Sequence, residues 1–150
     1  MRRRDFLAAV SAAFIPWRLL AQISATTIPA GSQLPAAELS KMLLGKGKPP
    51  LIVQVGSKVF YGEAHIRGSV YAGPGSQPNG LKALDATVAP HAKGEEIVLY
   101  CGCCPWGHCP NVGPAFQHLQ EKGYTNVKVL YMANNFGDDW ASKGYPTDRK

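Results

Sequence analysis

The sequence predicts an α/β fold: one open, mainly parallel β-sheet with helices on both faces. Short apolar runs rich in β-branched residues recur along the chain, and segments with helical periodicity separate them. The chain has 150 residues, enough for one compact domain with a short appendage. Its hydrophobic content of 45% supplies a core for both faces of a sheet.

The amino terminus predicts an export signal. Residues 3–7 (RRDFL) follow the twin-arginine pattern, and the apolar stretch 6–15 behind them is shorter than the roughly 20 residues needed to span a bilayer. We expect residues 1–25 to be a signal peptide cleaved after Ala25, with the twin-arginine export machinery as a partner and the periplasm as the destination. The alternative is a basic, amphipathic helix that belongs to the domain.

The net charge of +6 gives little support for nucleic-acid binding. Four arginines and one aspartate in the first 25 residues account for half of that charge. The remainder of the chain is only weakly basic and has no basic stripe with interleaved aromatic residues. We therefore expect no nucleic-acid partner.

The predicted elements alternate along the chain, starting after a turn-rich linker over residues 26–34. The domain itself is expected to span residues 35–150. Apolar β-branched runs predict buried strands, and apolar residues three or four apart predict helices. The strands are expected at residues 51–55, 69–72, 97–100 and 127–130, and the helices at 35–44, 60–64, 81–88, 115–122 and 138–142.

All four cysteines lie in one loop, directly after the strand at residues 97–100. They are Cys101, Cys103, Cys104 and Cys109. In open parallel sheets ligands bind beyond the carboxyl ends of the strands, and Cys101 occupies that position. The loop amides and the amino end of the following helix favour a thiolate and a bound anion there.

Several chemistries fit such a cluster. One cysteine is the nucleophile of a sulfurtransferase and carries sulfane sulfur as a persulfide, or Cys101 and Cys104 form a redox pair. Alternatively the cysteines, with His108, bind a soft metal ion, although the usual spacing of a structural zinc site is missing. The remaining alternative is a loop closed by local disulfides without catalysis. A phosphatase cradle of the Cys-x5-Arg type is excluded, because position 107 is Gly107.

Four segments together resemble the rhodanese-like (sulfurtransferase) family. The segment 64–69 is similar to the family's Gly-His-Ile-Pro-Gly-Ala, and 97–101 is similar to the strand that delivers its catalytic cysteine. The segments 119–130 and 140–146 resemble the closing helix and strand and the final Trp-x-x-x-Gly-Tyr-Pro. The matching segments read AHIRGS, IVLYC, LQEKGYTNVKVL and WASKGYP.

The resemblance implies a rhodanese-like open, mainly parallel sheet and an enzyme that transfers sulfur from a small donor to a thiophilic acceptor. It implies Cys101 as the nucleophile, and the notable departures lie close to it. Residues 54–56 read Gln-Val-Gly where the family has Asp-Val-Arg, and the lengthened cysteine loop contains no arginine. Backbone N–H groups would then hold an anionic donor, and the loop's length leaves Cys104 or Cys109 as alternative nucleophiles.

The candidate site residues all belong to this loop. Catalysis is assigned to Cys101, with Cys103 and Cys104 as resolving or sulfur-accepting thiols and Cys109 closing the loop from the helix side. Substrate binding is assigned to Gly102, Trp106 and His108. We expect neither a cofactor nor a bound metal, and the sequence leaves the oligomeric state open. His65 is expected to hold a turn by bonding backbone, and Trp140 is expected in the core.

Overall fold

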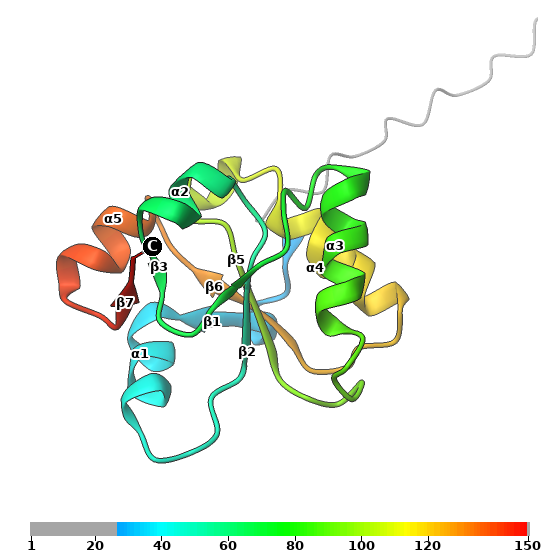
Figure 1. Ribbon diagram of the computed structural model, residues 1–150, viewed down its shortest axis with the longest axis horizontal. Coiled ribbons are helices and arrows are strands. Elements are labelled where there is room, and N and C mark those ends of the chain that lie inside the picture. Colours follow the sequence, from blue (N-terminus) through cyan, green and yellow to red (C-terminus); the bar gives the residue numbers. More distant parts are fainter. Residues whose placement is uncertain (1–26, 150) are drawn as a thin grey trace, which may run out of the picture.

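The computed structural model describes residues 27–149. Five parallel strands form its central sheet in the order β1-β6-β5-β2-β4, with β5 in the middle (Figure 1). The predicted signal peptide lies outside the described residues. Within residues 27–149 no helix has the length and apolar character to cross a membrane. The strands of the sheet are β1 Gln33–Pro35, β2 Leu51–Gln54, β4 Val70–Tyr71, β5 Ile97–Tyr100 and β6 Val127–Tyr131.

The two faces of the sheet are covered by different helices, as the sequence predicts (Figure 1). One hydrophobic cluster joins the sheet to α3 and α4, and the other joins it to α1 and α5. Successive strand residues point to opposite faces, so Leu99 enters the first cluster while Val98 and Tyr100 enter the second. The helices are α1 Ala36–Leu44, α2 Lys58–Glu63, α3 Pro78–Val88, α4 Val112–Glu121 and α5 Phe136–Asp139, with 3-10 turns η2 Ala30–Ser32, η3 Trp106–His108 and η4 Ala141–Lys143.

Two features differ from the sequence prediction. The end of the expected linker is β1, an edge strand of the sheet that pairs with β6, and Ile28 before it is buried in the core. This strand has only three residues, and its partner β6 lies about a hundred residues farther along the sequence. The local sequence therefore indicates the surrounding turns but not the strand. A second, antiparallel pair joins β3 His65–Ile66 to β7 Thr147–Asp148 near the carboxyl terminus.

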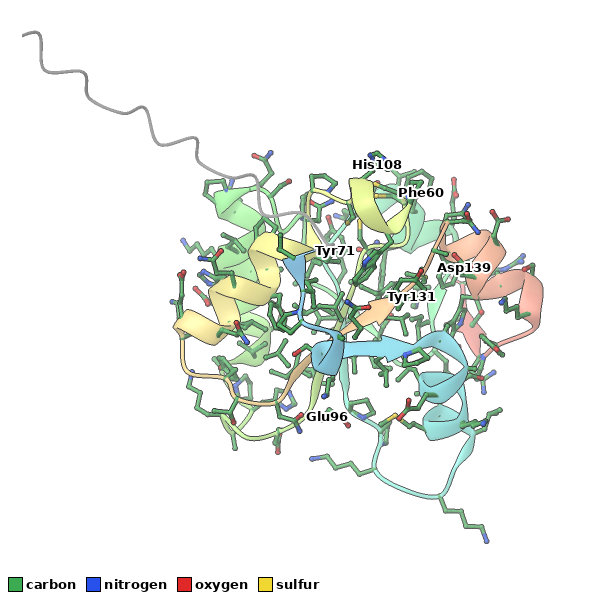
Figure 2. All side chains as sticks on the ribbon, turned by 180° about the vertical axis from the view of Figure 1, so that it is seen from behind. Phe60, Tyr71, Glu96, His108, Tyr131 and Asp139 are labelled. Atoms are coloured by element: carbon green, nitrogen blue, oxygen red, sulfur yellow. The ribbon has the colours of Figure 1, made fainter. Side chains whose placement is uncertain are left out.

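The carboxyl ends of the central strands meet at one end of the molecule. Figure 2 shows His108 and Phe60 at this end and Glu96, which precedes β5, at the opposite end. The cysteine loop begins here at the end of β5, includes the 3-10 turn η3, and ends where α4 begins at Val112. The predicted position of Cys101 at the end of a buried central strand is therefore confirmed.

Candidate active site

Cys101 is buried at the end of β5 and lies against other thiols of the loop. Its Sγ is 3.0 Å from the Sγ of Cys103, which in turn is 2.9 Å from the Sγ of Cys104. All four cysteines are free thiols, and Cys101 and Cys109 are the two buried ones. Gly102 turns the chain away from the strand with a φ of 80°, a conformation that favours glycine. The loop therefore holds sulfur atoms side by side without cross-linking them.

Hydrogen bonds concentrate a single negative charge on Cys101. The thiols of Cys103 and Cys109, the backbone N–H of Cys103 and the side chain of Asn111 bond to its Sγ, and together they lower the pKa of Cys101 to about 3 against the opposing effect of burial. The hydrogen bond to Cys101 raises the pKa of Cys103 and of Cys109, and burial raises it further. Both thiols therefore stay protonated and donate to Cys101. Cys101 is the thiolate of the cluster, the form in which a cysteine is nucleophilic.

Asn111 orients one of these donors. It is the N-cap residue of α4, where an asparagine side chain ordinarily accepts from the helix's own N–H groups, but here it makes no such cap. Its Oδ1 accepts from the backbone N–H of Ser76 at 3.2 Å and from the Ser76 hydroxyl at 2.8 Å. Its Nδ2 is thereby left to donate to Cys101 Sγ at 3.4 Å. Ser76 thus fixes which end of the amide faces the thiolate.

Gln54 and Gly56 hold Cys101 from the side of β2. The buried Gln54 side chain donates from Nε2 to the carbonyl of Cys101 at 3.0 Å and accepts from the backbone N–H of Gly56 at 3.2 Å. Gly56 lies so close to Cys101 that a Cβ there would be 2.7 Å from its Sγ. The departures from the family pattern at residues 54–56 therefore shape the immediate surroundings of the thiolate.

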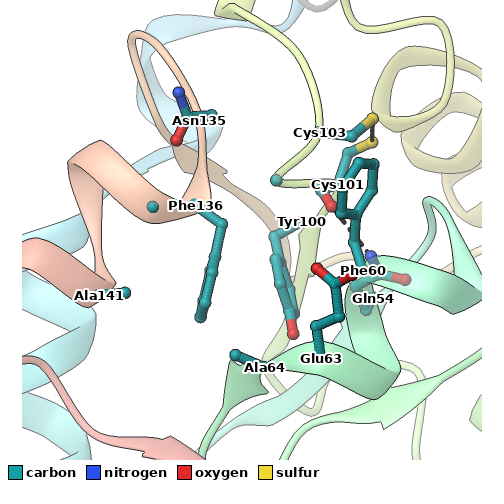
Figure 3. Close-up of a pocket in the computed structure, with 12 residues that line it drawn as sticks. Gln54, Phe60, Glu63, Ala64, Tyr100, Cys101, Cys103, Asn135, Phe136 and Ala141 are labelled. Atoms are coloured by element: carbon teal, nitrogen blue, oxygen red, sulfur yellow. Dashed lines mark hydrogen bonds between the residues drawn. The ribbon is translucent and has the colours of Figure 1, made fainter.

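A pocket of about 370 Å³ opens onto Cys101 and Cys103 (Figure 3). Its volume is in the range of small-molecule sites, and its walls are largely apolar. Figure 3 shows the rings of Phe60, Tyr100 and Phe136 around it. The lining residues are Gln54, Phe60, Glu63, Ala64, Tyr100, Cys101, Gly102, Cys103, Asn135, Phe136, Gly137 and Ala141.

The structure separates the predicted substrate-binding residues. Gly102 lines the pocket, whereas His108 is exposed on η3 and does not line it. Trp106 packs against Tyr131 with 5.0 Å between ring centroids and covers the opposite side of Cys101. There it encloses a small space of about 10 Å³ together with Cys104 and Cys109. Cys104 and Cys109 thus lie behind Cys101 rather than in the open pocket.

Two further residues have the structural roles that the sequence predicts. His65 Nδ1 is hydrogen-bonded to the carbonyl of Tyr61 at 2.8 Å, and the two rings stack at 4.0 Å. Trp140 is fully buried and donates from its indole nitrogen to the carbonyl of Pro146 at 3.0 Å. Both residues stabilise the domain rather than contact the pocket.

The thiols have the donor set of a soft metal site. The Sγ atoms of Cys101, Cys103 and Cys104 lie within 4.8 Å of one another, and thiolates favour ions such as Cu(I) and Zn(II). His108 does not belong to this group. The residues able to bind a metal are therefore Cys101 itself and the two thiols beside it.

A family model for the rhodanese-like domain matches residues 35–133. The chain belongs to the rhodanese-like domain family. The rhodanese-like domain of an Anabaena protein is 19% identical with a TM-score of 0.58, the alignment covering 79% of this chain and 80% of that one. A Bacillus halodurans protein is 21% identical with a TM-score of 0.60, over 78% and 76% of the two chains.

A rhodanese-like domain protein of Staphylococcus aureus is 16% identical with a TM-score of 0.53, over 79% of this chain and 98% of its own. No curated protein matches the chain. These likenesses establish the rhodanese-like fold, and the chemistry of the site follows from its own residues.

The depressed pKa of Cys101 predicts an unusual pH dependence of alkylation. A thiol of ordinary pKa loses about a thousandfold in reactivity between pH 8 and pH 5, because its thiolate disappears. Because its hydrogen bonds hold the pKa of Cys101 well below the ordinary range, its rate with iodoacetamide should fall far less than this between pH 8 and pH 5. The peptide containing residue 101, followed by mass spectrometry over time, reports this rate.

Asn111→Ala removes one donor and should move the midpoint of the Cys101 profile upward by about one pH unit. Ser76→Ala keeps the Asn111 amide but removes one of the two hydrogen bonds that orient it, so it should shift the midpoint of the Cys101 profile less. A Cys101 rate that falls tenfold per pH unit below pH 8 in the native protein would show that the thiol is not activated.

Proposed function

We propose that this protein is a sulfurtransferase that carries sulfane sulfur as a persulfide on Cys101. The observation that supports it most strongly is the buried Cys101 at the end of β5, whose Sγ is held by hydrogen-bond donors and lines a pocket large enough for an organic substrate. Family membership supports a sulfurtransferase-type role. The cysteine cluster adds thiols that are able to take sulfur onward.

The proposed reaction has two half-reactions. In the first, the Cys101 thiolate attacks the terminal sulfur of a donor R–S–S⁻. A bond forms between Sγ and that sulfur, while the donor's S–S bond breaks and R–S⁻ leaves with the electron pair. In the second, an acceptor thiolate attacks the outer sulfur and the Cys101 thiolate leaves. A leaving thiol of low pKa departs faster, so the hydrogen bonds to Sγ favour this second step.

The loop amides and the thiol protons supply the positive partial charges of the site. The backbone N–H of Cys103 and the Asn111 amide already donate toward Sγ, and the persulfide places its charge one atom farther into the pocket. Gly102 and Cys103 line this part of the pocket. These donors take the place of the arginine that is absent from the loop.

Intact-mass measurement of the reduced protein before and after treatment with a polysulfide tests the proposal. The native protein should gain the mass of one sulfur atom per chain, and Cys101→Ser should gain none. Cys103→Ser, which keeps the nucleophile, is the matched control and should still gain sulfur. Loading of the Cys101→Ser variant to the native level would contradict the assignment of Cys101.

A redox role is a second candidate, and the short Cys101–Cys103 contact favours it. In this role the Cys101 thiolate attacks a substrate disulfide R–S–S–R and releases R–S⁻. The Cys103 thiol then attacks Sγ of the resulting mixed disulfide, which forms a Cys101–Cys103 disulfide and releases the second R–S⁻, and this takes the thiol proton. The sequence pointed to Cys104 as the partner, but Cys104 is in direct contact with Cys103. Loss of two hydrogens with no sulfur-loaded form at any time would favour this role over transfer.

We also propose that the domain works in the periplasm after export in the folded state. Replacing Arg3 and Arg4 by lysine should retain the uncleaved precursor in the cytoplasm, because the twin-arginine pair is the feature that the export machinery reads. Cell fractionation with immunodetection measures the distribution. Unchanged export of the double variant would argue against this route.

A further inference from the structure

We propose that the pocket above Cys101 selects neutral or cationic organic substrates over inorganic anions, with Glu63 setting the charge preference and Phe60 forming an aromatic wall. This inference rests on the proposed function, because it names the class of molecule that the sulfur-transfer site accepts. It follows from the charges, the rings and the volume of the pocket.

The charge of the lining is negative. Among the described residues that line it, Glu63 is the one with a charged side chain apart from the cysteines, and none is a lysine, arginine or histidine. Within residues 27–149 no ion pair or hydrogen bond engages the Glu63 carboxylate, so its charge is not neutralised by a neighbour. Figure 3 shows this carboxylate beside Phe60 and Tyr100, facing the pocket.

A substrate therefore approaches two negative groups, the Glu63 carboxylate and the Cys101 thiolate. Glu63 is exposed, so its charge acts on a substrate at the entrance to the pocket. Charges of like sign repel there, whereas an ammonium group is attracted. A doubly charged inorganic donor such as thiosulfate meets this repulsion with no cation in the lining to offset it. A persulfide R–S–S⁻ attached to a neutral organic group carries only one negative charge, and one attached to a cationic group has no net charge, so both meet less repulsion.

The walls favour an organic group. Phe60 is 51% exposed and lines the pocket, so its ring is accessible to a bound group. With the partly buried Phe136 it offers aromatic rings to a cation or to another apolar group. A volume of about 370 Å³ also leaves an inorganic anion largely without contacts.

Charge-matched thiol reagents test the preference without requiring sulfur transfer. The native protein is treated at pH 5 with trimethylammonioethyl or sulfonatoethyl methanethiosulfonate, and modification of Cys101 is followed by peptide mass spectrometry. At this pH thiols of ordinary pKa are protonated and react slowly. Each rate is divided by that of the same reagent with a free small thiol. We expect the cationic reagent to be favoured by about tenfold or more.

The Glu63 variants separate the carboxylate from the thiolate. Glu63→Gln should reduce the preference at least threefold, and Glu63→Lys should reduce it further or reverse it. Glu96→Gln, at the opposite end of the molecule (Figure 2), is the matched control and should leave it unchanged. A preference near one in the native protein, or one that the Glu63 variants do not alter, would overturn the proposal.

The aromatic wall has its own test. Phe60→Ala should slow modification by benzyl methanethiosulfonate about three- to fivefold relative to the methyl reagent. Val59→Ala removes an exposed apolar side chain from the same helix that does not line the pocket, and it should have no such effect. An equal loss in both variants would overturn the role of Phe60. Because these reagents need only the thiolate and the pocket, failure of sulfur loading alone contradicts the proposed function and leaves this selectivity standing.

Discussion

Replacing Gly56 with alanine is expected to slow sulfur uptake by about 100-fold while the domain stays folded. The new methyl group would lie 2.7 Å from Cys101 Sγ and 3.0 Å from the Cys101 carbonyl, so the thiolate must move. Gln54, whose amide would lie 3.2 Å from the methyl, must move with it. Displacement of a reacting atom by about 1 Å is enough for a loss of this size.

The rate of mass gain with a polysulfide measures this effect, and far-ultraviolet circular dichroism checks the fold. Gly62→Ala is the matched control, because a Cβ at Gly62 meets nothing within 4 Å. It should load sulfur at the native rate. Native loading by a folded Gly56→Ala variant would mean that the position of Cys101 relative to β2 does not matter for the reaction.

Replacing Gly80 with alanine should cost about 3 kcal/mol or more of folding free energy, the largest stability effect of the substitutions considered. Gly80 is buried in the first turn of α3, and a Cβ there would lie 1.9 Å from the carbonyl oxygen of Pro74. That oxygen is backbone, so the helix and the loop before it must separate. The same loop carries Ser76, which orients Asn111.

Urea unfolding of both proteins measures the difference, and the melting temperature should fall by about 10 °C. Gly94→Ala is the control, since a Cβ at Gly94 meets nothing within 4 Å and the change should be close to neutral. If Gly80→Ala were as stable as the native protein, the packing of α3 against this loop would be looser than the structure shows.

The sequence was sufficient to predict four of the five strands of the sheet, the helices on its two faces and the position of Cys101. A short apolar run rich in β-branched residues followed by a cysteine cluster places Cys101 at the end of a buried strand, and β5 confirms it. Helical periodicity likewise predicted α3 and α4, since both bury one face against the sheet. A local sequence pattern is enough to predict a strand or a helix when burial makes apolar residues recur every two residues or every 3.6 residues.

The surroundings of Cys101 could not be predicted in the same way. Gln54 reaches it across 47 residues of sequence, and its role replaces a family pattern that the chain lacks. The sequence analysis did not single out Asn111, because its contacts with Ser76 and Cys101 depend on tertiary packing. The pocket itself is assembled from four separate segments of the chain. Contacts of this kind have no local signature.

Locating the sulfur on the loaded protein shows directly whether Cys101 is the residue that carries it. The polysulfide-treated native protein is alkylated, digested and sequenced by tandem mass spectrometry, so that a trapped persulfide marks the cysteine that carried it. We expect the extra sulfur on Cys101 from the earliest time point, before any appears on Cys103 or Cys104. Sulfur that appears first on Cys104 or Cys109, with Cys101 unmodified, would contradict the account.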